Sequence, residues 1–316
     1  MPLDPVAKTF LEGLAQIMPD VGTMSAQETR DEIAKVGAML APPELVTEVR
    51  DQQIPVDGAE ITVRTYRPPA DGPLPVVVYI HGGGWVLGRL EDYDAALDVL
   101  ALQTDSLIVS VDYRMAPEWK FPVPVEDCYA ATQWVADHAG ELGTDPDRLA
   151  VAGDSSGANL AAAVALMSRD RGGPGIALQI LVYPIARCHL EPEGYVQGVD
   201  TPPLTTVAMA WYTQQYLNGP ADLDNPYASP IAAEDLSGLP ATLLVTAEVD
   251  PLRDDCLDLG RRLQEAGVSL VASHYSDMFH GFYSFRGFIP QGDQAFEEVA
   301  SAIRHRLPVR APLPTG

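Results

Sequence analysis

The sequence predicts an α/β fold, in which a mostly parallel β-sheet is covered by helices on both faces. Short apolar segments rich in β-branched residues alternate with segments of helical periodicity through most of the chain. Parallel strands that are buried on both faces appear as continuous apolar runs, and helices usually connect them. The length of 316 residues suits one large domain, or one domain with a modest appendage.

The chain begins with helices and continues with alternating strands and helices. The spacing of Val6, Phe10, Leu14 and Ile17 predicts a first helix, and a second is expected over Ala26–Leu40, ending before the prolines at 42 and 43. We expect strands at Ile61–Tyr66, Val76–Ile80, Leu107–Val111, Leu149–Ala152, Leu178–Tyr183, Ala241–Thr246 and Ser269–Tyr275. We expect helices at Tyr93–Gln103, Val125–Gly140, Ala158–Arg171, Leu252–Ala266 and Asp293–Arg306.

One segment, between Ile185 and about Ile231, interrupts this alternation and is rich in Pro, Gly and acidic residues. Insertions of this size after a strand often form lids over ligand sites. We therefore interpret residues 1–45 plus 186–230 as a helical cap, and residues 46–185 plus 231–316 as a catalytic domain; two unrelated surface excursions are the alternative. The insertion contains one predicted helix, with an apolar face formed by Leu204, Val207, Ala208, Trp211 and Tyr212.

The composition excludes several classes of partner. The net charge of −24 disfavours nucleic acid and anionic lipid as partners. No apolar run reaches the roughly 18 residues that span a bilayer, so we expect no stable membrane insertion. The N-terminus does not resemble a secretory signal, which favours a cytoplasmic protein. Three scattered cysteines, Cys128, Cys188 and Cys256, predict buried free thiols and no metal site.

The strongest local motif is Gly153-Asp154-Ser155-Ser156-Gly157, which follows a predicted strand and opens a predicted helix. This context is typical of a nucleophile turn. The serine occupies a strained, sharp turn, and glycines two positions away allow the strand and the helix to approach closely. The motif predicts Ser155 as a nucleophile, with Ser156 as the rival hydroxyl.

A second motif, His81-Gly82-Gly83-Gly84-Trp85, directly follows the apolar strand Val76–Ile80. Consecutive glycines leave backbone N–H groups free to converge on a developing oxyanion. His81 comes before Ser155 in the chain, and this position is too early for the general base. We therefore expect His81 to brace this loop.

The general base should follow the acid, and both should follow the nucleophile in the chain. Of the later histidines, His280 lies in a predicted loop just after a strand, where ligands bind in open α/β sheets. His274 falls within the strand, His305 late in the last helix and His189 in the insertion. We therefore predict His280 as the base.

For the acid we favour Asp250, which comes soon after the predicted strand Ala241–Thr246. Asp250 followed by Pro251 also fits the start of a helix, which is a structural role. The alternative acids are Glu248, Asp254 and Asp255.

Taken together, these motifs resemble the hormone-sensitive-lipase family of α/β-hydrolases, in its branch of bacterial short-chain carboxylesterases. The resemblance covers nearly the whole chain and implies an α/β-hydrolase fold with an eight-stranded sheet, a helical cap and no cofactor. It places the oxyanion hole at the N–H groups of Gly83, Gly84 and Ser156, although the family commonly has alanine at the position of Ser156. The matching motifs are His81–Trp85, Asp112–Glu118, Phe121-Pro122, Gly153–Gly157, Asp250–Arg253 and His280–Phe282.

The expected reaction is hydrolysis of a small-molecule carboxylic ester with a short or medium acyl chain, through a Ser-His-Asp triad and an acyl-enzyme. Lid residues Phe10, Trp211 and Tyr212 are expected to form the acyl pocket, and Trp85 is a further candidate for substrate binding. Amidase, lactonase or acyltransferase activity with the same triad is the alternative, as is a receptor-like ligand binder without catalysis. Similar proteins are frequently dimers, which leaves a homodimer open.

Overall fold

The computed structural model describes residues 3–19, 21–37 and 44–308. Within them, eight strands form a single sheet in the order β1-β2-β4-β3-β5-β6-β7-β8. β1 pairs with β2, and β2 with β4, in antiparallel orientation, whereas all other neighbouring strands are parallel. The strands are β1 Glu48–Val56, β2 Ala59–Arg67, β3 Leu74–Ile80, β4 Leu107–Asp112, β5 Thr144–Asp154, β6 Leu178–Val182, β7 Ala241–Val249 and β8 Leu270–Phe279.

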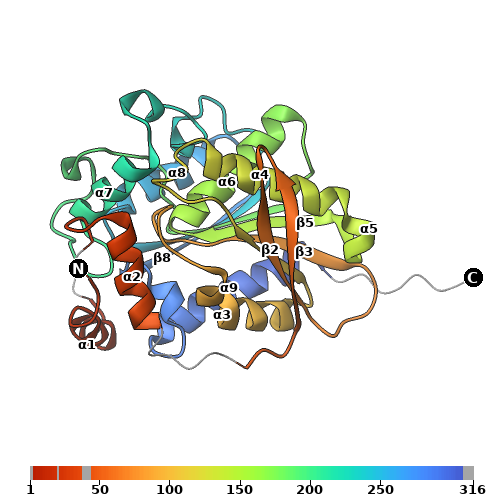
Figure 1. Cartoon of the computed structure of the whole chain (residues 1–316), viewed down its shortest axis with the longest axis horizontal. Helices are drawn as coiled ribbons and strands as arrows, with labels where there is room; N and C mark the ends of the chain where they lie inside the picture. The colour runs from red at the N-terminus through yellow and green to blue at the C-terminus, as the bar shows by residue number, and fades with distance from the viewer. Residues whose placement is uncertain (1–2, 20, 38–43, 309–316) are drawn as a thin grey trace, which may run out of the picture.

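Helices cover both faces of the sheet, as the sequence predicts (Figure 1). One apolar core lies between the sheet and α4, α6 and α8, and a second between the sheet and α3 and α9. The central strand β3 is buried along its whole length, which is why its sequence is a continuous apolar run. The helices are α1 Pro5–Leu14, α2 Ala26–Gly37, α3 Leu90–Thr104, α4 Val123–Asp137, α5 Ala139–Leu142, α6 Ser156–Arg171, α7 Thr206–Tyr216, α8 Arg253–Glu265 and α9 Pro290–Arg306.

The structure corrects the sequence prediction at several elements. β1 was missed because this edge strand is polar and mostly exposed, so it lacks an apolar run. The strand predicted to end at Tyr275 continues to Phe279, past an irregular register, so His280 directly follows a strand end. The helix predicted over Val125–Gly140 is divided into α4 and α5. Residues 38–40 of the second predicted helix lie outside the described residues.

Two predicted apolar faces are also wrong in part. α1 buries Ala7, Leu11 and Leu14, whereas Val6 and Ile17 are each 51% exposed and Ile17 lies beyond the helix. In the insertion, Leu204 precedes α7 and Val207 is 55% exposed. In both helices, the buried residues lie on a face that is rotated about the helix axis from the face that the apolar spacing predicted.

The N-terminal helices and α7 lie together at one end of the molecule (Figure 1). The N-terminal segment contacts the insertion directly, because a Cβ atom placed on Gly22 would lie 3.5 Å from Val207 and 3.8 Å from Trp211. The segment is also joined to the strand that precedes His280, since the amide of Asp4 donates to the carbonyl of Asp277 over 3.0 Å.

Candidate active site

Ser155 occupies the sharp turn between β5 and α6. Its backbone φ of 55° is a conformation that side-chain-bearing residues rarely adopt. The flanking glycines are required sterically, since a Cβ atom on Gly153 would lie 2.5 Å from the carbonyl oxygen of Ile80. A Cβ atom on Gly157 would meet the same oxygen and would lie 2.6 Å from the carbonyl oxygen of His81. The turn therefore requires a glycine two positions before the serine and another two positions after it.

Ser155, His280 and Asp250 form a continuous chain of hydrogen bonds. Ser155 Oγ lies 2.9 Å from His280 Nε2, and His280 Nδ1 lies 2.8 Å from Asp250 Oδ2. Asp250 is fully buried, whereas His280 keeps 6% and Ser155 keeps 9% of its surface exposed. Burial thus increases from the serine, which faces a cavity, to the carboxylate, which is shielded from water.

The second oxygen of Asp250 is held by the local backbone. Asp250 Oδ1 accepts a hydrogen bond from the amide of Leu252 over 2.8 Å. α8 begins at Arg253 and its N-cap residue is Leu252. Asp250 therefore lies in the turn that precedes the helix, two positions before the N-cap. This turn orients one oxygen toward the backbone and leaves the other for His280.

The alternative acids have other partners. Glu248 pairs with Arg253 and with His274, over 3.0 Å and 2.9 Å. Asp254 pairs with Arg253 over 2.8 Å, and Asp255 contacts His189 over 3.0 Å. Among the described residues, only Asp250 of the four candidates bonds to His280.

The glycine loop after β3 is placed beside Ser155 by Asp154. The amide of Gly82 donates to Tyr93 Oη over 2.9 Å and to Asp154 Oδ1 over 3.3 Å. Asp154 also accepts hydrogen bonds from the hydroxyls of Tyr79 and Tyr93, over 2.9 Å and 3.3 Å. Burial raises the pKa of Asp154 above its usual value. Sequence reasoning missed Asp154 and both tyrosines; the position of Asp154 within the motif is the only local signal for it.

The amides of Gly83 and Gly84 donate no hydrogen bond within the described part of the chain. Both glycines have positive φ angles, 112° and 62°. His81 braces this loop, as expected: its Nδ1 lies 2.7 Å from the carbonyl oxygen of Gly82, and its ring stacks on Tyr113 at 4.4 Å. Burial lowers the pKa of His81, which favours the neutral ring.

A cavity of about 760 Å³ opens above Ser155. The part of the chain that carries the sheet contributes Gly83, Gly84 and His280, among others, to its wall. The N-terminal segment contributes Met18, Val21, Ile33 and Ala34, and the insertion contributes Pro203, Leu204 and Tyr212. Segments far apart in the sequence thus enclose one apolar space over the serine.

Known proteins resemble this chain in sequence and in structure. Residues 77–284 match a family model described as an alpha/beta hydrolase fold. A carboxylesterase of Mycobacterium tuberculosis, NlhH, is 37% identical, with 96% of each chain covered. An arylesterase of Saccharolobus solfataricus is also 37% identical and covers 89% of this chain and 92% of its own length.

The solved structure of a hyperthermophilic esterase from Pyrobaculum calidifontis superposes with a TM-score of 0.90. It is 42% identical and covers 96% of this chain and 99% of its own. The chain belongs to the hormone-sensitive-lipase-like family of α/β-hydrolases. It is a carboxylesterase, and the expected fold is confirmed.

Two aromatic residues predicted to bind substrate in this esterase do not line the cavity. Trp85 is fully buried, stacks on Tyr216 at 4.2 Å and donates to Asn159 over 3.3 Å. Trp211 packs against Tyr212, with ring centroids 5.1 Å apart, and of this pair only Tyr212 lines the cavity. Phe10, expected in the acyl pocket, instead packs against Phe285 at 4.7 Å. Tyr212 lines the cavity as expected.

The three cysteines of the esterase are free and buried, as predicted. Burial raises the pKa of each thiol, and that of Cys188 reaches about 12. The described residues contain no cluster of three or more His, Cys, Asp or Glu side chains suited to a metal ion. None of their helices has the length and apolar character needed to cross a bilayer.

Proposed function

We propose that this carboxylesterase hydrolyses its substrates through Ser155, His280 and Asp250. His280 Nε2 removes the proton of Ser155 Oγ, which attacks the ester carbonyl and forms a tetrahedral intermediate. The protonated His280 then donates to the leaving alcohol, and an acyl-enzyme remains. Water, deprotonated by His280, attacks the acyl-enzyme and releases the acid. Asp250 fixes the imidazole tautomer and stabilises its charged form.

The proposed oxyanion hole consists of the backbone amides of Gly83, Gly84 and Ser156. The two glycine amides have no partner within the described residues, and they line the cavity that contains Ser155. Preorganised donors of this kind contribute roughly 3–4 kcal/mol each to transition-state stabilisation in a comparable enzyme. Because the hole uses a backbone N–H at position 156, serine in place of the common alanine is compatible with activity.

We propose that residues 1–45 and 186–230 act as a cap that restricts the esterase to short- and medium-chain acyl esters. The cavity receives apolar side chains from both segments, which supports one cap rather than two unrelated excursions. Tyr212 stands over the glycine loop: a Cβ atom on Gly84 would collide with its ring. The ring of Tyr212 at this position reduces the space available to a long acyl chain. The cytoplasmic location and the homodimer stay predictions.

The observation that carries the proposal is the unbroken hydrogen-bonded chain from Ser155 through His280, both of which line the cavity, to the buried Asp250. The test is hydrolysis of p-nitrophenyl esters, from C2 to C16 acyl chains, by wild type, Ser155→Ala and Ser156→Ala. We expect rates that peak on short chains, loss of activity in Ser155→Ala, and retention in Ser156→Ala.

Each contrary outcome overturns a different part of the proposal. Activity surviving in Ser155→Ala, or lost only in Ser156→Ala, would show that the nucleophile is misassigned. Comparable rates on C4 and C16 esters would refute the restriction by the cap. A wild type that is inactive on all the esters, yet cleaves anilides or lactones, would favour the amidase or lactonase alternative.

A further inference from the structure

Arg286 lines the same cavity as Ser155 and His280. It directly follows a short 3₁₀ helix, Phe282–Phe285, in the segment that begins with the proposed base. We infer that Arg286 binds a carboxylate carried by the substrate, so that the preferred substrates are esters with a second, anionic group. This inference rests on the proposed function, because it concerns the same cavity.

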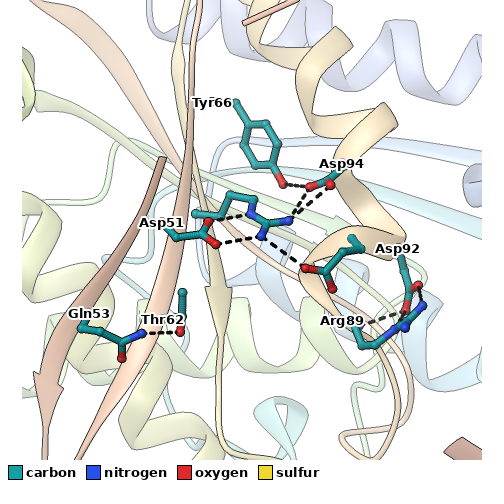
Figure 2. A network of polar contacts seen from close by, with 9 residues as sticks. Asp51, Gln53, Thr62, Tyr66, Arg89, Asp92 and Asp94 are labelled. Atoms are coloured by element: carbon teal, nitrogen blue, oxygen red, sulfur yellow. Dashed lines mark hydrogen bonds and ion pairs between the residues drawn. The ribbon is translucent and has the colours of Figure 1, made fainter. Parts of the chain in front are cut away.

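Within the described residues, Arg286 has no hydrogen-bond or ion-pair partner. Its Nε atom is buried and unpartnered. Arg286 as a whole is half-buried and lines the cavity, so it offers an unpaired cation to an anion that enters there. Arg89, which lines the same cavity, instead pairs with Asp92 over 2.6 Å (Figure 2).

The acidic side chains around the cavity are already engaged. Asp94 and Glu91 both pair with Arg64, over 3.0 Å and 3.2 Å, and Asp94 also accepts from Tyr66 (Figure 2). Asp293, close to Arg286 in sequence, accepts from the amide of Gly287 over 3.1 Å. Asp154 is occupied by the two tyrosines and the glycine loop. No carboxylate of the described residues neutralises Arg286.

The guanidinium is nevertheless held in a defined position. It stacks on the ring of Phe296, with Cζ 4.1 Å from the ring centroid. A stacked guanidinium keeps its in-plane N–H donors available, and their planar fork matches a carboxylate. Phe296 is 3% exposed, so its ring is itself fixed by packing in the core. The pair therefore forms a preorganised anion receptor.

Tyr283 lies beside this receptor at the cavity wall. It lines the cavity, and its ring stacks on that of Phe296, with the ring centroids 5.7 Å apart. The net charge of −24 gives no general attraction for anions, so a preference for an anionic ester has to arise from a local cation.

The experiment compares anionic and neutral esters of similar size on the acyl side and on the alcohol side. The acyl pair is p-nitrophenyl hydrogen glutarate and p-nitrophenyl hexanoate; the alcohol pair is 4-acetoxybenzoate and 4-methylphenyl acetate. The variants are Arg286→Met, Arg286→Gln and Arg286→Lys. Arg261→Met is the matched control, since it removes an exposed arginine from α8, away from the cavity.

We expect Arg286→Met and Arg286→Gln to lower kcat/KM by about 10- to 100-fold on the anionic member of one pair, as loss of a charged hydrogen bond predicts. Activity on the neutral members should be unchanged, and Arg286→Lys should keep part of the preference. The affected pair shows whether the carboxylate belongs to the acid or to the alcohol. Arg261→Met should change neither the activity on the anionic esters nor the activity on the neutral esters.

An equal loss on anionic and neutral esters would overturn the inference and make Arg286 structural. Unchanged kinetics in all the Arg286 variants would overturn it as well. If Arg286→Met does not fold, Arg286→Gln, which keeps a planar group over Phe296, provides the same test. A wild type inactive on all four esters would instead refute the proposed function, so the two failures are distinguishable.

Discussion

The amide of Gly82 donates a hydrogen bond to the carboxylate of Asp154, over 3.3 Å. Through this bond, the residue before the proposed nucleophile fixes the loop that supplies two of the proposed oxyanion donors. Three of the groups around Asp154 are donors, namely this amide and the hydroxyls of Tyr79 and Tyr93. We therefore expect Asp154 to be a positioning residue, which acts on the reaction through the placement of Gly83 and Gly84.

Replacement of Asp154 by alanine should lower kcat far more than it changes KM. The loop amides lose their anchor, and displacement of a positioned group by about 1 Å can cost on the order of 10²-fold in rate. We expect a loss of this size on p-nitrophenyl butyrate for Asp154→Ala and a much smaller one for Asp154→Asn, whose amide oxygen still accepts. A rise in KM alone would argue against a role in positioning.

The pH dependence of stability should also reveal Asp154. Burial raises its pKa in the folded protein above the ordinary value of 3.8, so the folded state binds this proton more tightly than the unfolded chain does. The resulting stabilisation is complete at low pH and is lost as the pH rises through the raised pKa. Urea unfolding of wild type and Asp154→Asn from pH 4 to 8 should show the wild type losing its relative advantage with rising pH. A relative advantage that grows with pH would contradict this sign.

Gly84 should be far more sensitive to alanine substitution than Gly72. Both have positive φ angles, 62° and 83°, but a Cβ atom on Gly72 meets nothing within 4 Å, whereas one on Gly84 collides with Tyr212. Gly72→Ala should cost about 1 kcal/mol of stability and leave the rate unchanged. Gly84→Ala should abolish most ester hydrolysis. Similar kinetics for the two variants would show that the loop tolerates displacement.

Asp250→Asn should lower kcat by roughly 10⁴-fold, the loss seen when an asparagine replaces the acid of a serine-protease triad. Asp255→Asn provides a control, because its carboxylate contacts His189 and Arg187 rather than His280. We expect the control to retain most activity in the same p-nitrophenyl assay. A large loss in Asp255→Asn together with a small one in Asp250→Asn would reassign the acid.

Trp85 and Tyr212 should respond differently to truncation. Trp85 is fully buried against Tyr216, so Trp85→Ala should lower the free energy of unfolding by about 3–5 kcal/mol and leave the preference for acyl length unchanged. Tyr212 lines the cavity, so Tyr212→Ala should shift the preference toward longer chains. Denaturant titration and the p-nitrophenyl series measure the two effects. A shift in chain preference from Trp85→Ala would restore Trp85 as a substrate-binding residue.

The fold class and the two active-site motifs are determined by the sequence alone, because their physical causes are local. Buried parallel strands require apolar runs, and the turn at Ser155 requires glycines at 153 and 157, where any Cβ atom would collide with neighbouring backbone. A polar edge strand such as β1 leaves no comparable signal. The sequence therefore predicted the other seven strands of the sheet and missed β1, one of its two edge strands.

Tertiary structure decided what depends on contacts between distant segments. His280 and Ser155 are 125 positions apart, and the sequence favoured Asp250 but left Glu248, Asp254 and Asp255 as alternatives. Only the fold shows that Asp250 bonds to His280. The same holds for Trp85, because its place after the glycine loop does not reveal that it packs against Tyr216. It holds also for Arg286, whose lack of a hydrogen-bond or ion-pair partner among the described residues is a property of its surroundings. Residue type and spacing determine which chemistry the chain can perform. Packing determines which of several equivalent side chains faces the substrate, because only the assembled core sets where each one lies.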